Sequence, residues 1–392
     1  MANISFIMDR FPGGGVERVT MNLTRPLTEL GHRVFLFVNE LRPEKLPEEQ
    51  LSITYIELPH KVNREENYGI ILDAIKRYNI QIFFMPGMFP RYIKALRATG
   101  LCKIVNVLHS MPFNEVVYKR GEITRPPQKE SIGSWLKRNI LSKPKLKLGY
   151  YDRKMLKRYK DIYNDSDIYG VLFDSYGEQL AKKMGIDYDS SNIRTLQNPI
   201  PAVDFNAEEC KREKRLVYVG RLSYWDKRLD RLLAVWEKLH LKFTDWRLTF
   251  VGDGEEERNL RDIVAKKGLE RVEFLGWQNR PFEYFLTSEI MCMTSIVEGC
   301  PMALLEAQQC GCATIAFNCC NGVSEIISKN WENGVYVPDG NIDSYAEALS
   351  KLMSNDELRH KIQGNGPINA KRFSVEASVK QYDKLINELC TK

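Results

Sequence analysis

The sequence predicts an α/β protein made of two doubly wound domains, each with a parallel β-sheet covered by helices. Short apolar runs typical of buried strands alternate with helix-like apolar periods from one end of the 392 residues to the other. Asn198-Pro199 and Pro201 interrupt this alternation within residues 196–205, which we interpret as an interdomain linker. Because the alternation restarts after the linker, we expect two separate parallel sheets, in residues 1–200 and 201–373. A C-terminal helix over residues 374–392 is expected to pack back on the first domain.

The first half of the chain contains six expected strands and several helical patterns. The strands are expected at Ile4–Met8, Arg33–Val38, Ile53–Ile56, Ile80–Met85, Lys103–Leu108 and Ile168–Phe173. Helical periods lie between several of them, at Val16–Leu30, Tyr68–Tyr78 and Tyr176–Met184.

The second half repeats the alternation after the linker. Expected strands are Leu216–Gly220, Trp246–Gly252, Val272–Gly276, Ile290–Thr294 and Ala313–Phe317. Expected helices are Leu229–His240, Glu255–Lys267, Met302–Cys310 and Ser344–Met353. In open parallel sheets ligands bind beyond the carboxyl ends of the strands, so the loops after strands are the candidates for function.

The composition is that of a globular protein in a reducing compartment. The chain is 43% hydrophobic and 28% charged, and none of its apolar runs approaches the roughly 20 residues of a membrane-spanning helix. Its nine cysteines show neither a disulfide framework nor a zinc-ligand spacing. The first residues lack the basic start and apolar core of a signal peptide. We therefore expect a cytoplasmic location.

Three glycines follow the first expected strand, at Gly13, Gly14 and Gly15. Glycines let the backbone approach a phosphate closely, and the N-terminus of the next helix presents N–H groups to it. A tight turn is the alternative, although such a turn needs only one glycine. A dinucleotide-binding fingerprint is disfavoured, because Arg18 occupies the position of its third glycine.

Two basic residues, Arg221 and Lys227, lie in the loop after the strand Leu216–Gly220. A guanidinium and an ammonium that converge on an anion can neutralise a diphosphate leaving group without a metal. Basic residues are common in loops, so an ordinary solvated loop remains the alternative.

Two glutamates, Glu298 and Glu306, flank a strand-to-helix turn eight residues apart. Pro301 suits a first helical position and Gly311 a C-terminal cap, so a short helix is expected between them. The backbone N–H groups of Met302, Ala303 and Leu304 are then expected to be unpaired and to face the opening. This arrangement suits a nucleotide sugar, with carboxylates on hydroxyl groups and amides on the diphosphate; chance spacing is the alternative.

Several motifs, taken together and in order, resemble the family 4 retaining glycosyltransferases of the GT-B fold. These motifs are Gly13-Gly14-Gly15-Val16-Glu17-Arg18, Val219-Gly220-Arg221 with Lys227, Val251-Gly252-Asp253-Gly254, Phe274-Leu275-Gly276, Glu298 with Glu306, and Asn321 to Ile327. The resemblance implies two facing Rossmann-like domains with the active site in the cleft between them.

The resemblance also implies a role for each candidate residue. Arg221 and Lys227 would hold the donor diphosphate, Glu298 the donor sugar and Glu306 the ribose. Trp277 would lie near the base, Gly14 and Gly15 over the phosphates, and His109 beside the reacting sugar. The chain departs from the common pattern at Tyr224-Trp225-Asp226 and at Cys300, which stands where phenylalanine is commoner.

We expect transfer of a sugar, with retention at the anomeric carbon, from a nucleotide-diphosphate donor to a hydroxyl group. UDP-sugars are favoured over GDP-sugars, and neither a metal nor another cofactor is expected. The expected acceptor is a lipid-linked saccharide, of the polyprenyl-diphosphate type, in cell-surface polysaccharide assembly. The alternatives are a sugar-nucleotide epimerase and a non-catalytic subunit that binds a nucleotide sugar. Asp165-Ser166-Asp167 and Asp187-Tyr188-Asp189 spell the metal-binding D-x-D pattern, but we interpret both as surface turns.

The stretch from Lys119 to Lys160 carries most of the excess positive charge. It contains 14 Lys/Arg and 3 Asp/Glu, a net charge of +11 against +6 for the whole chain. Apolar residues such as Trp135 and Ile140 are interleaved with these charges, a mixture that suits an anionic membrane surface. A solvated helical face is the alternative, and nucleic acid is disfavoured because no nucleic-acid motif accompanies the charge. We expect peripheral association with the inner membrane face.

Overall fold

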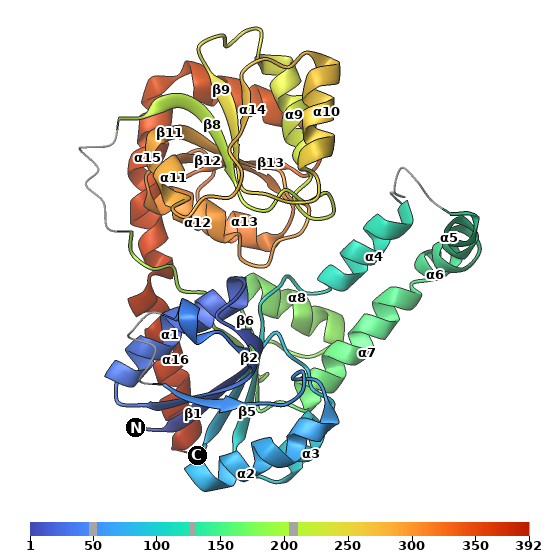
Figure 1. The fold of residues 1–392 in the computed structure, drawn as a ribbon, viewed down its shortest axis with the longest axis vertical. Coiled ribbons are helices and arrows are strands. Elements are labelled where there is room, and N and C mark those ends of the chain that lie inside the picture. Colours follow the sequence, from blue (N-terminus) through green and yellow to red (C-terminus); the bar gives the residue numbers. More distant parts are fainter. Residues whose placement is uncertain (47–52, 125–130, 204–210, 392) are drawn as a thin grey trace. The chain divides into compact units, whose positions relative to one another are not determined.

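The computed structural model describes residues 1–46, 53–124, 131–203 and 211–391. It divides into two compact units, one of residues 1–201 with 375–392 and the other of residues 202–374. Each unit contains one parallel sheet (Figure 1). The expected linker begins after β7 (Ile193–Thr195) and its last residues, 204 and 205, lie outside the described part. Within the described part, no helix has both the length and the apolar character needed to cross a bilayer.

The first unit has a seven-stranded parallel sheet in the order β3-β2-β1-β4-β5-β6-β7. The strands before β7 are β1 (Asn3–Phe11), β2 (Arg33–Leu41), β3 (Thr54–Glu57), β4 (Ile82–Pro86), β5 (Lys103–Leu108) and β6 (Ile168–Val171). All six coincide with the expected strands to within a few residues. The central residues of these strands are buried on both faces, as the continuous apolar runs predict, except in the edge strand β3, whose central residues are only half-buried.

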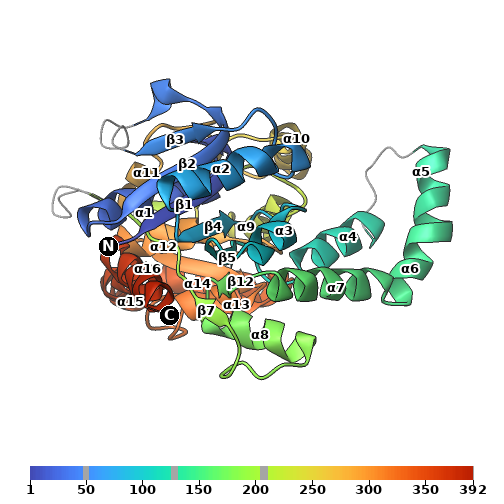
Figure 2. The ribbon, with the colours of Figure 1, turned by 90° about the horizontal axis from the view of Figure 1, so that it is seen from below.

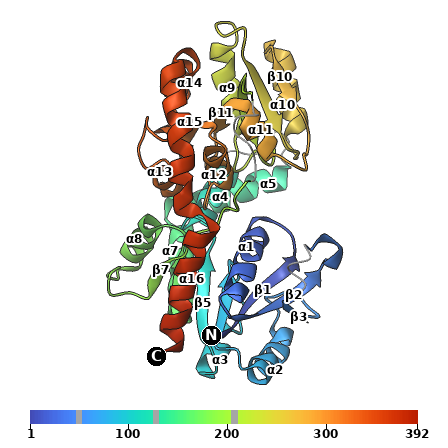
Figure 3. The ribbon, with the colours of Figure 1, turned by 90° about the vertical axis from the view of Figure 1, so that its left-hand side faces the viewer.

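Helices cover both faces of this sheet. The helices α1 (Gly15–Glu29) and α16 (Val375–Cys390) pack on one face, and α2 (Tyr68–Tyr78) and α3 (Ile93–Ala98) on the other. Figure 3 shows α16 beside α1. The remaining helical segments are α4 (Asn114–Thr124), α5 (Ile132–Leu136), η4 (Lys137–Ser142), α6 (Lys143–Lys147), α7 (Tyr150–Asn164), α8 (Asp174–Met184) and the 3₁₀ turns η1 (Pro43–Lys45) and η3 (Glu65–Asn67).

The C-terminal helix α16 belongs to the core of the first unit. Tyr382 is buried, and its ring centroid lies 5.7 Å from that of Phe84 in β4. Asp383 accepts a hydrogen bond from the buried His32 ring at 2.9 Å, which ties α16 to the turn before β2. Residues more than 350 positions apart in the sequence thus share one hydrophobic core.

The second unit has a six-stranded parallel sheet in the order β10-β9-β8-β11-β12-β13. The strands are β8 (Glu213–Val219), β9 (Arg247–Val251), β10 (Val272–Phe274), β11 (Ser288–Met293), β12 (Ala313–Asn318) and β13 (Val335–Pro338). The helices are α9 (Leu229–Leu239), α10 (Glu257–Lys267), α11 (Phe282–Thr287), α12 (Met302–Gln309), α13 (Asn321–Ile326), α14 (Ile342–Ser354) and α15 (Asp356–Ala370), followed by the 3₁₀ turn η6 (Lys371–Phe373). If the six strands are numbered from one in chain order, their order in the sheet is 3-2-1-4-5-6, which is the order of nucleotide-binding doubly wound sheets.

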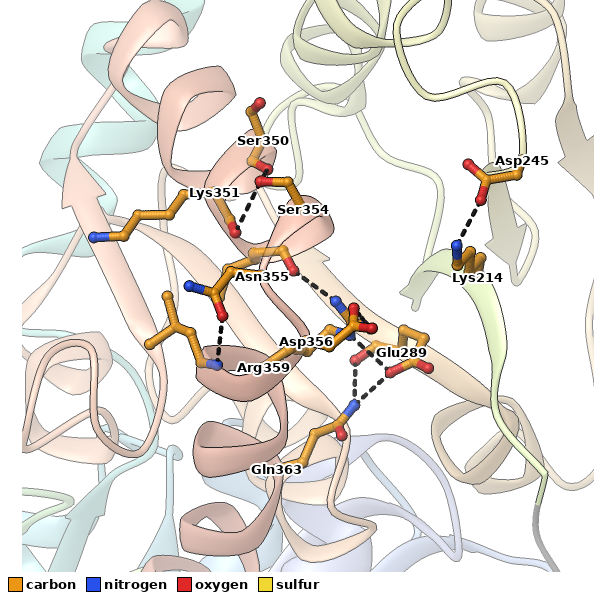
Figure 4. Close-up of polar contacts among 12 residues, drawn as sticks. Lys214, Asp245, Glu289, Ser350, Lys351, Ser354, Asn355, Asp356, Arg359 and Gln363 are labelled. Atoms are coloured by element: carbon orange, nitrogen blue, oxygen red, sulfur yellow. Dashed lines mark hydrogen bonds and ion pairs between the residues drawn. The ribbon is translucent and has the colours of Figure 1, made fainter.

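A buried arginine joins α15 to the sheet of the second unit (Figure 4). The Arg359 guanidinium, 3% exposed, donates to Glu289 at 3.0 Å, to Asp356 at 2.7 Å and to the Leu352 carbonyl at 2.9 Å. Gln363 donates to the Glu289 carboxylate at 2.7 Å, so both charges have their partners. Such a network stabilises only when it is complete, because a buried charge without a partner is costly.

We expect Arg359→Leu to lower the free energy of unfolding by about 3–5 kcal/mol, since it leaves the Glu289 carboxylate buried without its cation. Urea unfolding of the full chain measures the loss. The matched control is Lys214→Ala, which breaks an ion pair whose two side chains are both about half exposed and should leave the midpoint unchanged. An Arg359→Leu midpoint equal to that of wild type would show that the network adds nothing to stability.

Candidate active site

Two loops of the second unit meet at the point where its strand order reverses. The strands β8 and β11 are parallel neighbours at this point, so the loops after them emerge at the same sheet edge. Ligands of doubly wound sheets bind in the crevice at this switch point. Arg221 and Lys227 lie in the loop after β8, and Glu298 lies in the loop after β11.

Glycines shape the loop after β8. Gly252, after β9, has a φ of +130°, and a Cβ there would overlap the Gly220 carbonyl. Gly254 has a φ of +155°, and a Cβ there would overlap the Leu222 carbonyl. Only glycine allows these two loops to approach so closely, which explains the Gly-Arg and Gly-Asp-Gly motifs in physical terms.

Arg221 is held at the loop by a buried carboxylate. Its Nη2 lies 2.9 Å from Oδ2 of Asp226, whose side chain is 8% exposed while that of Arg221 is 62% exposed. Burial alone would raise the pKa of Asp226, but Ser223, Lys227 and Arg221 stabilise the carboxylate and keep its pKa below the ordinary value. The sequence does not indicate this partner, although Asp226 stands directly beside the predicted Lys227.

Lys227 and Glu298 are in direct contact. The Lys227 Nζ donates to the Glu298 carboxylate at 2.7 Å, and both side chains are mostly buried. Burial alone would lower the pKa of Lys227, but the carboxylate of Glu298 and the neighbouring Tyr218 raise it above its ordinary value. Lys227 therefore keeps its positive charge at neutral pH in spite of its burial.

Further hydrogen bonds join the two loops around this ion pair. Ser295 donates its hydroxyl to Glu298 at 2.6 Å, and Thr294 donates to the Lys227 carbonyl at 3.1 Å. The backbone N–H of Ile296 donates to the Asp226 carbonyl at 2.8 Å. The residues that follow β11 thus fix the backbone at Asp226 and Lys227. Sequence patterns do not reveal this preorganisation.

The helix after Glu298 begins at Met302, as expected, but Pro301 is not its first residue. Pro301 precedes α12 rather than opening it, and Gly311 follows the helix with the expected positive φ of +64°. The prediction of three unpaired N–H groups is wrong for Leu304, because its N–H donates to the Pro301 carbonyl at 3.0 Å. Met302, Ala303 and Glu306 are half-buried on this helix. The first turn of α12 is tight, so the Leu304 N–H is used within the helix and is not available to a ligand.

Cys300 lies between the two glutamates in the sequence and close to both of their charges. Burial raises the pKa of its thiol, and Glu298, Cys320 and Glu306 raise it further. Cys300 thus lies within electrostatic reach of both glutamates. Trp277, which follows β10 and Gly276, is 65% exposed.

The first unit contains the other three candidates. Gly14 and Gly15 lie at the N-terminus of α1, directly after β1, where the order of that sheet reverses between β1 and β4. His109 follows β5, and its Nδ1 lies 3.0 Å from Oδ1 of Asn198. Burial lowers the pKa of His109 to about 4, while the hydrogen bond to Asn198 opposes the shift, so the ring is neutral at pH 7. Because this pKa lies below that of a free imidazole, the contribution of His109 to stability is lost as the pH falls towards 4.

Both D-x-D sequences have structural partners. Asp167 accepts a hydrogen bond from the Ile104 N–H at 2.8 Å, and Asp187 accepts from the Ser190 hydroxyl at 2.7 Å. Among the described residues, no three or more His, Cys, Asp or Glu side chains are grouped to hold a metal ion.

Comparison with known proteins gives the second unit a family. Residues 201–368, which include both loops at the switch point and α12, match the sequence family described as "Glycosyl transferases group 1". These residues belong to the group 1 glycosyltransferases. The group 1 domain thus contains the Lys227–Glu298 ion pair, Arg221 and Glu306.

Individual relatives are similar to this chain over part of their length. The amylovoran biosynthesis glycosyltransferase AmsD of Erwinia amylovora is 32% identical over 201 residues, 51% of this chain and 56% of that protein. The N-acetylgalactosamine-N,N'-diacetylbacillosaminyl-diphospho-undecaprenol 4-alpha-N-acetylgalactosaminyltransferase of Campylobacter jejuni is 29% identical over 163 residues, 41% of this chain and 43% of that protein. The chain spans about half the length of the curated relatives it matches.

The solved structures confirm the fold class. The crystal structure of Anabaena Alr3699/HepE in complex with UDP has a TM-score of 0.72 and 14% identity, covering 98% of this chain and 100% of that one. The chain therefore has the GT-B fold, with two parallel-sheet α/β domains.

Proposed function

We propose that this chain is a retaining, metal-independent glycosyltransferase that takes a sugar from a UDP-sugar and attaches it to a lipid-linked saccharide in cell-surface polysaccharide assembly. The observation that carries the proposal is the Lys227–Glu298 ion pair beside Arg221, at the switch point of a group 1 glycosyltransferase domain. UDP is bound in the HepE structure, and the Campylobacter relative is named for an undecaprenol-linked acceptor.

The charges of the site fit the departure of a nucleoside diphosphate. The glycosidic bond of the donor breaks with an oxocarbenium-like transition state, and negative charge grows on the leaving phosphate. Lys227 stays protonated at neutral pH, and the exposed Arg221 guanidinium is aimed by Asp226. Fixed positive groups of this kind stabilise developing charge without reorganising during the reaction.

The carboxylate of Glu298 has a binding role in this proposal. It is neutralised by Lys227 and accepts from Ser295, so it is a weak nucleophile and a good acceptor for sugar hydroxyl groups. We propose that Glu306 binds the ribose and Trp277 lies near the base. Same-face departure and attack, assisted by the leaving phosphate, then gives retention without a covalent glycosyl-enzyme intermediate.

His109 is proposed to lie beside the reacting sugar. With a pKa of about 4 it is neutral throughout the physiological range and its Nδ1 is engaged with Asn198, so it can orient a hydroxyl group but adds no charge. The basic stretch 119–160 is proposed to meet an anionic membrane surface, where a lipid-linked acceptor would be found.

Incubation with a panel of UDP- and GDP-sugars, with and without a polyprenyl-diphosphate-linked saccharide, tests the proposal. We expect release of UDP from one UDP-sugar, dependent on the acceptor, and an α-linked product from an α-linked donor. Consumption of the donor without acceptor would indicate an epimerase. Binding of donor without turnover under any condition would indicate a non-catalytic subunit.

Activity should persist when divalent metals are removed with EDTA, because Arg221 and Lys227 supply the positive charge that a metal would supply to the diphosphate. The turnover of treated and untreated enzyme is compared, with Mg²⁺ or Mn²⁺ added back as the control. Loss of turnover that either metal restores would contradict this prediction and return the D-x-D sequences to consideration.

A further inference from the structure

The segments α5, η4 and α6 form one helix that the rest of the first unit does not bury. The backbone is helical from Ile132 to Lys147, with residues at both junctions in right-handed helical conformation. The helix lies at the far end of α4 and α7, which run outward from the sheet of the first unit (Figure 2). None of its residues is buried.

Its two faces differ in character. Arg138, Ser142 and Leu146, spaced four apart, are half-buried. The opposite series, Ile132, Leu136, Ile140 and Leu148, is apolar and exposed, from 42% at Leu136 to 81% at Ile132. Trp135 and Leu141, also apolar, are 51% and 54% exposed.

The π-helical turn of η4 keeps this apolar series on one face. Residues four apart drift around an α-helix, because 3.6 residues complete one turn. In the π-turn of η4 each hydrogen bond spans five residues instead of four, so each residue turns less about the helix axis. This smaller rotation cancels part of the drift. An amphipathic helix normally turns its apolar face towards the core, whereas this helix turns that face outward.

The helix is also strongly basic. Residues 131–149 contain five Lys/Arg and no Asp or Glu. Within the described ranges, none of the four lysines at 137, 143, 145 and 147 forms an ion pair with a carboxylate. Lys145 instead lies over the ring of Tyr150, at 5.4 Å from its centroid. The exposed apolar groups lie between lysines that have no carboxylate partner. This combination suits the surface of an anionic bilayer, where an apolar acyl region lies beneath a layer of negatively charged headgroups.

We propose that the helix 132–148 docks the protein on an anionic lipid bilayer by inserting its apolar face at the boundary of headgroups and acyl chains. This inference rests on the proposed membrane-linked acceptor and narrows the contact from the 42-residue basic stretch to one helix. Ile132, Leu136, Ile140 and Leu148 enter the acyl boundary, Trp135 lies at the interface, and the lysines meet lipid phosphates. A second copy of the chain is a poorer occupant, because two such helices would bring ten positive charges together.

Sedimentation with vesicles tests the docking. The wild-type chain should bind vesicles that contain phosphatidylglycerol and should bind pure phosphatidylcholine vesicles weakly. Replacing the four lysines with serine should lower the partition coefficient by about 10²–10³-fold, at roughly five-fold per lysine. Replacing Leu136, Ile140 and Leu148 with serine should lower it on the order of 10²-fold while the lysines remain.

Matched controls are available in the same unit. Lys61, Lys76, Lys94 and Lys182 are exposed and lie outside the helix, and their replacement by serine should leave vesicle binding within about two-fold of wild type. Leu30, Ile70 and Leu101 are likewise exposed apolar residues elsewhere on the unit, and serine there should have no effect on binding. Circular dichroism of each variant shows that loss of binding is not loss of folding.

Brominated lipids report insertion directly. Tryptophan fluorescence of the wild-type chain should be quenched by lipids brominated near the headgroup, and Trp135→Phe should remove most of the quenching without releasing the protein. Equal vesicle binding by the helix variants and wild type would overturn the proposal. So would a helix-dependent dimer in sedimentation velocity without vesicle binding, which would assign the apolar face to a second copy.

The docking and the proposed function can fail separately. Transfer to a soluble acceptor analogue should be unchanged in the lysine and apolar variants, while transfer to a vesicle-embedded acceptor should fall with binding. If the wild-type chain transfers sugar to the soluble acceptor analogue but does not bind vesicles, the docking alone is refuted. Vesicle binding with no transfer from any donor would refute the function alone.

Discussion

Replacing Lys227 with alanine, or Glu298 with glutamine, is expected to lower the transfer rate on the order of 10²–10³-fold while the chain stays folded. Lys227 supplies a buried positive charge that Glu298 holds at 2.7 Å. In the proposed mechanism this charge stands beside the leaving diphosphate, and Glu298 also accepts a hydrogen bond from the donor sugar. Glu298→Gln keeps the size of the side chain and a hydrogen-bond acceptor but removes the negative charge. Steady-state turnover with saturating acceptor measures the effect.

A surface ion pair of the same unit is the control for these two variants. Lys238 and Asp343 are 2.8 Å apart and largely exposed, so Lys238→Ala removes a lysine–carboxylate contact that lies outside the two loops. Its turnover should equal that of wild type. If the Lys227 or Glu298 variant retained more than half of wild-type turnover, the assignment of the ion pair to catalysis would be wrong.

Gly15→Ala is expected to lower kcat/KM for the donor by about 10²-fold without loss of stability, because an added methyl group would displace donor phosphates from the site proposed at the start of α1. Gly15 is the first residue of α1, its φ is not in the left-handed region, and no atom lies within 4 Å of an added Cβ. The chain itself therefore has no steric need for glycine at this position, so a loss of activity without loss of stability would indicate a ligand there.

Gly69→Ala is the matched control, because Gly69 lies in the first turn of α2, is exposed and also has open space around an added Cβ. Both variants should melt at or slightly above the wild-type temperature, and only Gly15→Ala should lose activity. A Gly15→Ala variant that unfolds at a lower temperature, with its activity per folded molecule intact, would favour a tight turn over a phosphate site.

Much of the fold follows from local patterns in the sequence. Continuous apolar runs predict most strands, and β5 at Lys103–Leu108 has the predicted bounds. The sequence does not indicate β7 or β13, because Ile193–Thr195 and Val335–Pro338 are short edge strands with little apolar periodicity. Nor does it place α16 in the core of the first unit in detail, since contacts such as that of Tyr382 with Phe84 depend on the folded chain.

The candidate site follows from its motifs but not from its contacts. Glycine positions and the spacing of charges indicate the loops after β8 and β11, whereas side chain pairing is a tertiary property. The resemblance assigns Lys227 and Glu298 to different parts of the donor, yet the two side chains form an ion pair with each other. Asp226, Ser295 and Asn198, which hold Arg221, Glu298 and His109, have no motif of their own and were not predicted.

Isothermal titration of the chain with UDP in the presence of EDTA tests the central claim most directly. We expect wild type to bind UDP without a divalent metal and to bind it more tightly than uridine, since Arg221 and Lys227 are proposed to bind the diphosphate. Arg221→Ala should weaken UDP binding by at least ten-fold and leave uridine binding unchanged. Absence of UDP binding by the wild-type chain, or equal binding by the Arg221→Ala variant, would contradict a diphosphate site at the switch point of the second unit.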